Sequence, residues 1–175
     1  MKFLKILAIF IVSLCVLPGC FQKYEIDDFK STENKFDWGS VSVKLEGEMK
    51  LKNNIAVRNA PYELLIWFEP DAYIGGIIKI SRLKLIYAKS GKVVFERNDI
   101  PEQYLEKNIR VINKPEKKIV ENYLAYFSFK NISMEYSDAI LQMDFILKQG
   151  GKSVKYNSEI YFEKDYKEFK MMKGA

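Results

Sequence analysis

A strict alternation of apolar and polar side chains is the feature that most constrains the fold of this chain. Over residues 40–51 every second position is apolar, and the positions between carry serine, lysine or glutamate. Successive side chains of a β-strand point to opposite faces, so this period of two predicts a strand with one buried face and one wet face. The side chains expected to point inward are Val41, Val43, Leu45, Met49 and Leu51.

Similar patterns predict strands along most of the chain. The apolar run at residues 62–68 lies between Pro61 and Pro70 and favours a central strand, with Trp67 as the aromatic plug of the core. Residues 77–88 also alternate, but the phase slips near Ser81-Arg82, which indicates a β-bulge. Further alternating strands are expected at residues 93–96, 123–129, 138–148 and 154–162.

Turn signals separate these strands. Asn53-Asn54, the loop at residues 89–92 and the Gly150-Gly151 pair each stand between two strand patterns. Residues 97–118 are less regular, with a short helix expected around residues 102–107 and a short strand after it. Seven or eight short strands predict an all-β fold: an antiparallel two-layer sandwich, immunoglobulin-like in general architecture. A small β-barrel is the alternative.

The N-terminus carries a different pattern. Two lysines stand within residues 1–5, and residues 6–17 are apolar except for Ser13. Twelve residues rise about 18 Å as a helix, whereas a bilayer core needs about 20 residues. A basic start followed by a short apolar stretch indicates a secretory signal rather than a transmembrane span.

The sequence Leu17-Pro18-Gly19-Cys20 that follows resembles the lipobox of bacterial lipoproteins. Leu17, Gly19 and Cys20 match the family's pattern, and Pro18 replaces the usual Ala, Ser or Thr. The resemblance covers residues 1–20 only. It implies that the signal is cut before Cys20, that the thiol is joined to diacylglycerol, and that the new amine receives a further acyl chain such as palmitate. Several acyl chains anchor a protein stably to a membrane.

The residue after Cys20 bears on the choice of membrane. In Gram-negative lipoproteins an Asp at that position favours retention at the inner membrane, and here the residue is Phe21. The resemblance therefore implies the periplasmic face of the outer membrane. A Gram-positive source would place the anchor on the outer face of the plasma membrane instead.

The length of 175 residues suits one domain behind this anchor. We expect a signal peptide at residues 1–19, a lipid-anchored tether at 20–37, the sandwich at 38–163 and a charged tail at 164–175. The tether is inferred because residues 21–37 mix both charges without a clean period. The alternative is that Tyr24, Ile26 and Phe29 dock onto the domain and shorten the tether.

Composition narrows the possible chemistry. The chain has no histidine and two cysteines, Cys15 and Cys20, which leaves no imidazole base and no basis for a Ser-His-Asp or Cys-His arrangement. Phosphate-binding and dinucleotide-binding glycine motifs are missing as well. The sequence therefore predicts no cofactor, no metal and no enzymatic activity, with a hydrolase built from two carboxylates as a distant third hypothesis.

Two segments are candidate contact surfaces. The loop between the strands at residues 62–68 and 77–88 carries Tyr73 and Ile74, which could anchor a partner protein. A basic stretch carries Lys114, Lys117 and Lys118, which could touch anionic lipid headgroups. Nucleic acid is not an expected partner for an exported protein.

The leading hypothesis is a non-catalytic accessory lipoprotein that binds another envelope protein. The alternative is a module that binds a small ligand or glycan, which predicts a pocket lined by several of the 11 tyrosines and 2 tryptophans.

Overall fold

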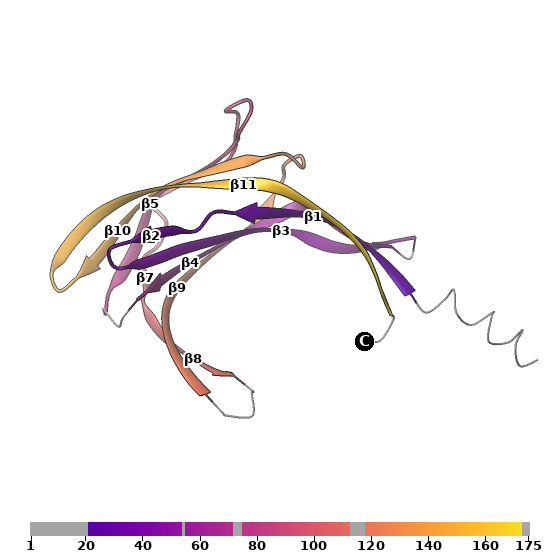
Figure 1. Ribbon diagram of the computed structural model, residues 1–175. Coiled ribbons are helices and arrows are strands. Elements are labelled where there is room, and N and C mark those ends of the chain that lie inside the picture. The colour runs from indigo at the N-terminus through magenta and orange to yellow at the C-terminus, as the bar shows by residue number, and fades with distance from the viewer. Residues whose placement is uncertain (1–20, 54, 72–74, 113–117, 173–175) are drawn as a thin grey trace, which may run out of the picture.

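The computed structural model describes residues 21–53, 55–71, 75–112 and 118–172 (Figure 1), without the side chains of 21, 108–123 and 172. Every regular element among these residues is a β-strand, as the alternation predicts. In chain order the strands are β1 Phe21–Ser31, β2 Asn34–Phe36, β3 Gly39–Lys52, β4 Ile55–Pro70, β5 Ile77–Tyr87, β6 Val93–Asn98, β7 Gln103–Tyr104, β8 Glu106–Ile112, β9 Lys118–Ile132, β10 Ala139–Gln149 and β11 Lys152–Met172.

The strands form one continuous open sheet in the order β2-β3-β4-β1-β11-β10-β5-β6, with β9 and β8 branching from β4, and β7 from β5. The sheet folds over itself, so that β4 faces β10 and β9 faces β6 without hydrogen bonds between them. Phe68 of β4 meets Phe145 of β10 with ring centroids 5.0 Å apart, and Phe95 of β6 meets Phe129 of β9 at 5.7 Å. This two-layer arrangement confirms the all-β sandwich, and the sheet does not close into the alternative barrel.

Almost all neighbouring strands run antiparallel. The exception is β1 with β4, which are parallel from Lys23↔Ile55 to Ile26↔Arg58. The same edge of β4 then turns to β9, which it pairs from Tyr62↔Ile132 to Phe68↔Ala125. Because β4 changes partner along its length, it belongs to the sandwich at one end and to a different arrangement at the other.

That arrangement is a four-stranded extension in which the two layers merge edge to edge. Beyond the core, β3 and β4 from one layer join β1 and β11 from the other in the order β3-β4-β1-β11 (Figure 1, right). We call this extension the arm and define it as residues 48–53, 55–59, 21–27 and 165–172. One face of the arm therefore continues the inner side of the layer that contains β3 and β4. The same face continues the outer side of the layer that contains β1 and β11.

The bend of β4 into the arm depends on a close backbone approach at Gly47. Gly47 pairs with Tyr62 and Glu48 pairs with Asn59, which leaves Ala60 and Pro61 as a bulge. A Cβ at position 47 would lie 2.7 Å from the carbonyl oxygen of Asn59, so that only glycine fits without moving backbone. Glycine thus lets β3 and β4 stay paired through the bend.

The predicted tether and tail are wrong over the residues that the structure describes, because most of 21–37 and all of 164–172 belong to the sheet. Ile26 and Phe29 are buried, as the docking alternative expects. Residues 21–31 are β1, residues 34–36 are β2, and residues 164–172 complete β11. β1 and β11 pair through eleven consecutive positions, from Phe21↔Met172 to Ser31↔Phe162. The mixed charges that suggested a linker pair across the strands, with Lys167 Nζ lying 3.1 Å from Asp28 Oδ2.

The core aromatic is also not the predicted one. Trp67 lies on the outer face of β4 against Tyr126, whereas Trp38 is only 8% exposed. Trp38 stacks on Phe36 and Phe68, with ring centroids 5.7 and 6.3 Å away. The run at residues 62–68 is apolar on both parities, so its pattern did not reveal which face is inside.

Several local predictions are confirmed and others are wrong. The bulge at Ser81 is present, since Arg82 pairs with Asp144 and Ile80 pairs with Phe145. The predicted turns occur, with positive φ at Gly91, Gly150 and Gly151. The expected helix is instead β7 and the start of β8. Met49 and Leu51 are 44% and 68% exposed, because β3 has left the sandwich by then.

The two tryptophans form a matched pair for a stability test. We expect Trp38→Ala to lower the free energy of unfolding by about 3–5 kcal/mol, because it empties the space between two aromatic rings. Trp67→Ala should cost about 1–2 kcal/mol, since that side chain is only partly buried. Urea denaturation measures both, and an equal or reversed order would contradict the assignment of Trp38 to the core.

Candidate functional site

The residue that follows the predicted lipidation site in the sequence, Phe21, lies at the tip of the arm. Leu17, Gly19 and Cys20 lie outside the described residues, which begin at Phe21. Phe21 is the first residue of β1 and pairs with Met172 at the arm's end. Consecutive Cα atoms are about 3.8 Å apart, so a group attached at residue 20 starts next to the sheet with no spacer between.

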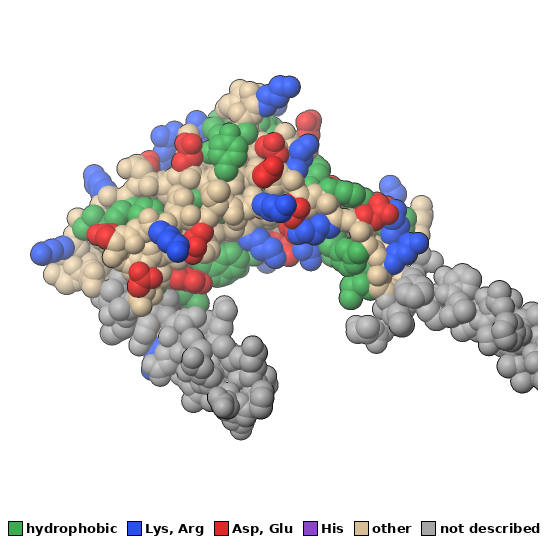
Figure 2. Space-filling model, in the orientation of Figure 1, with side chains coloured by type: hydrophobic (Ala, Val, Ile, Leu, Met, Phe, Trp, Pro, Cys, Tyr) green, Lys and Arg blue, Asp and Glu red, His purple; other side chains and the backbone are tan. Residues whose placement is uncertain are grey.

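One face of the arm exposes apolar side chains. The aligned row Leu51, Ala56, Tyr24, Phe169 crosses all four strands. Tyr24 and Phe169 stack with ring centroids 5.1 Å apart, and Ala56 is buried beneath its neighbours. Figure 2 shows hydrophobic side chains and lysines together on the arm. We call this the apolar arm face, which comprises Tyr24, Met49, Leu51, Phe169 and Met171.

The opposite face of the arm is polar. Lys23 Nζ lies 2.8 Å from Glu25 Oε1 and 3.0 Å from Glu168 Oε1, which raises the pKa of Lys23 and lowers that of Glu168. The Tyr166 hydroxyl also donates to Glu168 Oε2 over 3.2 Å. Because its charges are satisfied by each other, this face is suited to water, and the arm as a whole is amphipathic.

A carboxyl and two phenols meet at the base of the arm, where the layers separate. Burial, helped by the charge of Glu25, raises the pKa of Asp27. Burial also raises the pKa of Tyr136 to about 12 and that of Tyr62 further, with Asp27 contributing to both. The Tyr136 hydroxyl donates to the carbonyl of Asp28 over 3.0 Å. The ionised Asp27 is therefore an energetic cost at this junction.

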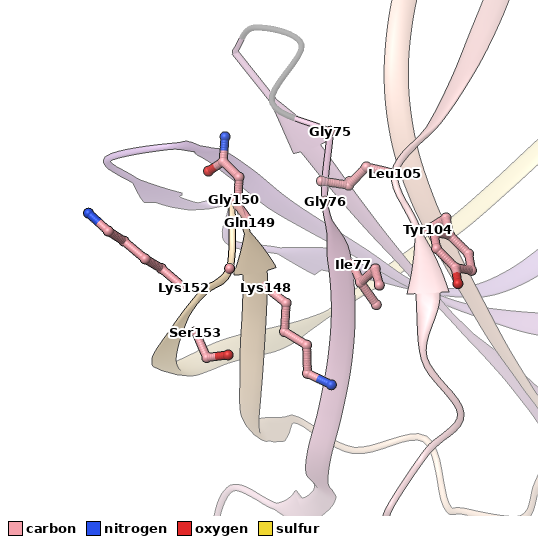
Figure 3. A pocket seen from close by; sticks show the side chains of 11 residues that line it. Gly75, Gly76, Ile77, Tyr104, Leu105, Lys148, Gln149, Gly150, Lys152 and Ser153 are labelled. Carbon is pink, nitrogen blue, oxygen red and sulfur yellow. The ribbon is translucent and has the colours of Figure 1, made fainter.

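The other end of the molecule holds a shallow depression of about 520 Å³ beside the predicted contact loop. Tyr73 and Ile74 lie outside the described residues, and Gly75 and Gly76, which follow them, line the depression. Figure 3 shows Tyr104 on one side of Ile77 and Lys148, Gln149 and Ser153 on the other. Tyr104 is the single aromatic among the residues that line this depression.

One depression lined by two carboxylates lies on the outer face of β10 and β11. Asp144 and Glu159 share a depression of about 380 Å³ with Arg82. Asn157 Nδ2 donates to Asp144 Oδ1 over 2.5 Å, and Gln142 Nε2 donates to Glu159 Oε2 over 3.2 Å. These bonds are those of a hydrated polar sheet face. Within the described residues no cluster of His, Cys, Asp or Glu could hold a metal ion.

The predicted lysine contact lies at the connection between β8 and β9. Lys114 and Lys117 are outside the described residues, and Lys118 opens β9 opposite Ile112. The described residues next to the three predicted features lie apart: Phe21 is at the arm tip, Gly75 lines the depression at the opposite end, and Lys118 begins β9.

Comparison with known proteins adds no assignment, since no family model, no curated protein and no solved structure matches this chain. In the part of the chain that the structure describes, no helix is long and apolar enough to cross a bilayer.

The apolar arm face was missed at the sequence level. Its signal was present, because residues 169 and 171 alternate with Lys170 just as residues 49 and 51 alternate with Lys50. What the pattern could not show was that these two segments, more than a hundred residues apart, share one sheet beyond the end of the core.

The neighbours Asp27 and Asp28 allow a test of the charge balance at the arm's base. A folded-state pKa above the ordinary value means that ionised Asp27 opposes folding above the unfolded-state pKa, near 3.8. We therefore expect Asp27→Asn to raise the melting temperature at about pH 7. This gain should shrink as the pH falls from the raised folded-state pKa of Asp27 toward its unfolded-state pKa. Asp28→Asn should give no gain, because it removes the ion pair with Lys167. A loss of stability in Asp27→Asn at neutral pH would contradict this account.

Proposed function

We propose that this chain is a lipid-anchored, non-catalytic accessory protein of the bacterial envelope that holds a β-sandwich at a membrane and binds another envelope protein. The observation that carries the proposal is Cys20, the cysteine of the lipobox-like sequence that follows a short apolar stretch. The pairing of Phe21 with Met172 supports it, because a fold that begins at once after the cysteine suits a protein held close to its anchor.

The shape of the fold supports a division between an anchored end and a presenting end. β11 runs for 21 residues from the Gly150-Gly151 turn to the arm tip, a path of up to about 65 Å at 3.3 Å per residue. An anchor at residue 20 would hold the arm at the membrane and turn the other end away from it. The depression beside the Tyr73–Ile74 loop, at that other end, would then be the surface available to a partner.

Phe21 favours the periplasmic face of the outer membrane as the location, by resemblance to Gram-negative lipoproteins. The outer face of the plasma membrane is the location in a Gram-positive cell.

Metabolic labelling with a clickable palmitate analogue tests the anchor. We expect the label in the wild-type protein and in Cys15→Ala, whose changed residue lies in the cleaved leader, and a loss of label in Cys20→Ala. Purification from detergent-solubilised envelope should also recover a partner in stoichiometric amount. Label that persists in Cys20→Ala would contradict the anchor, and a monodisperse monomer without partner would contradict the accessory role.

A further inference from the structure

The apolar arm face is unusual because it is both exposed and ordered. Leu51 is 68% exposed, Met49 and Met171 are each 44% exposed, and Phe169 is 38% exposed. Met49 and Leu51 lie on β3, and Phe169 and Met171 lie on β11, the two outer strands of the arm. Ala56 and Tyr24 lie between Leu51 and Phe169 in one row, and the rings of Tyr24 and Phe169 stack. Contiguous apolar surface on a β-sheet is costly in water, so an ordered face of this kind indicates an apolar occupant.

The charge at the arm tip indicates which occupant. The tip, which we define as residues 21–24, 49–53, 55–56 and 169–172, carries Lys23, Lys50, Lys52 and Lys170 and no acidic residue. Three of these lysines lie in one row across the arm, Lys52–Ile55–Lys23–Lys170, on the face opposite the apolar one. The acids that pair with Lys23 and Lys50, namely Glu25, Glu168 and Glu48, lie closer to the sandwich.

An amphipathic sheet with one apolar, aromatic face and lysines on the opposite face fits the interface of a bilayer. Apolar and aromatic groups bury into the acyl boundary, while lysine stems extend along apolar surface and place their ammonium groups among anionic headgroups. Each lysine near an anionic surface contributes about 1 kcal/mol to binding. The tip thus has the chemistry of a lipid-surface contact, with no acid to repel the headgroups.

We infer that the apolar arm face docks on the lipid bilayer beside the anchor, with the tip lysines on anionic headgroups. The inference rests on the proposed function, because a lipid at residue 20 would bring the membrane within one peptide bond of Phe21, the first residue of the arm tip. The arm and the anchor then act as two contacts on one membrane, which fixes the orientation of the sandwich. A protein partner for the same face is the competing occupant.

Fluorescence quenching by spin-labelled lipid tests the docking. The cysteine variant Leu51→Cys is processed in cells from the full-length chain, labelled with an environment-sensitive fluorophore, and reconstituted into vesicles of phosphatidylethanolamine and phosphatidylglycerol. Met171→Cys gives a second site on β11. Tyr104→Cys is the matched control, because Tyr104 is 66% exposed and lies at the opposite end of the sandwich.

Doxyl lipids should quench the probes at 51 and 171 several-fold more than the probe at 104, and less strongly in vesicles without the anionic lipid. Equal quenching at all three sites would overturn the inference. So would a probe at 51 that native envelope shields from aqueous iodide but that spin-labelled lipid does not quench, since a protein would then cover the face.

The mass of the same purified sample separates this inference from the proposed function. A lipidated protein whose position 51 is not quenched contradicts the docking and leaves the anchor in place. A protein without the diacylglycerol mass contradicts the proposed function, and with it the inference that rests on it.

Discussion

The antiparallel ladder between β1 and β11 is the interaction on which the rest of the structure depends. Its eleven pairs join the first described strand to the last one, and the remaining length of β11 pairs with β10 in the second layer. β1 also pairs with β4, which is the hydrogen-bonded link between the two layers in the described part of the sheet. Phe29 of β1 packs edge-on against Tyr62 and Phe162, so the same strand fills the core.

This ladder determines how firmly an anchor at residue 20 would hold the domain relative to the membrane. A flexible tether would let the domain sample many orientations at a distance from the membrane. A strand that begins at Phe21 instead transmits the position of the anchor to the whole sheet, because it is paired with β11 along its length and with β4 at residues 23–26. The proposed lipid contact of the arm and the proposed partner surface at the other end both follow from that rigidity.

Sequence patterns predicted the structural features that depend on residues close together along the chain. The inward set Val41, Val43 and Leu45 and the bulge at Ser81 follow from local periodicity. β1 was mistaken for a tether because its longest pairing is with β11, more than 130 residues away, and because its charges pair across strands, as with Lys167 and Asp28.

The alternation of the sequence also could not show where the hydrophobic core ends. Leu51 continues the alternation of Leu45 but lies past the edge of the opposing layer, so an apolar residue in phase is exposed.

Hydrogen exchange of the backbone amides in β1 tests most directly the central claim that β1 is a paired strand of the sheet. The account predicts slow exchange at residues 23–26, comparable with that of β10, because these residues are paired with β11 on one side and with β4 on the other. Exchange at the rate of an unstructured peptide would contradict it and restore the tether.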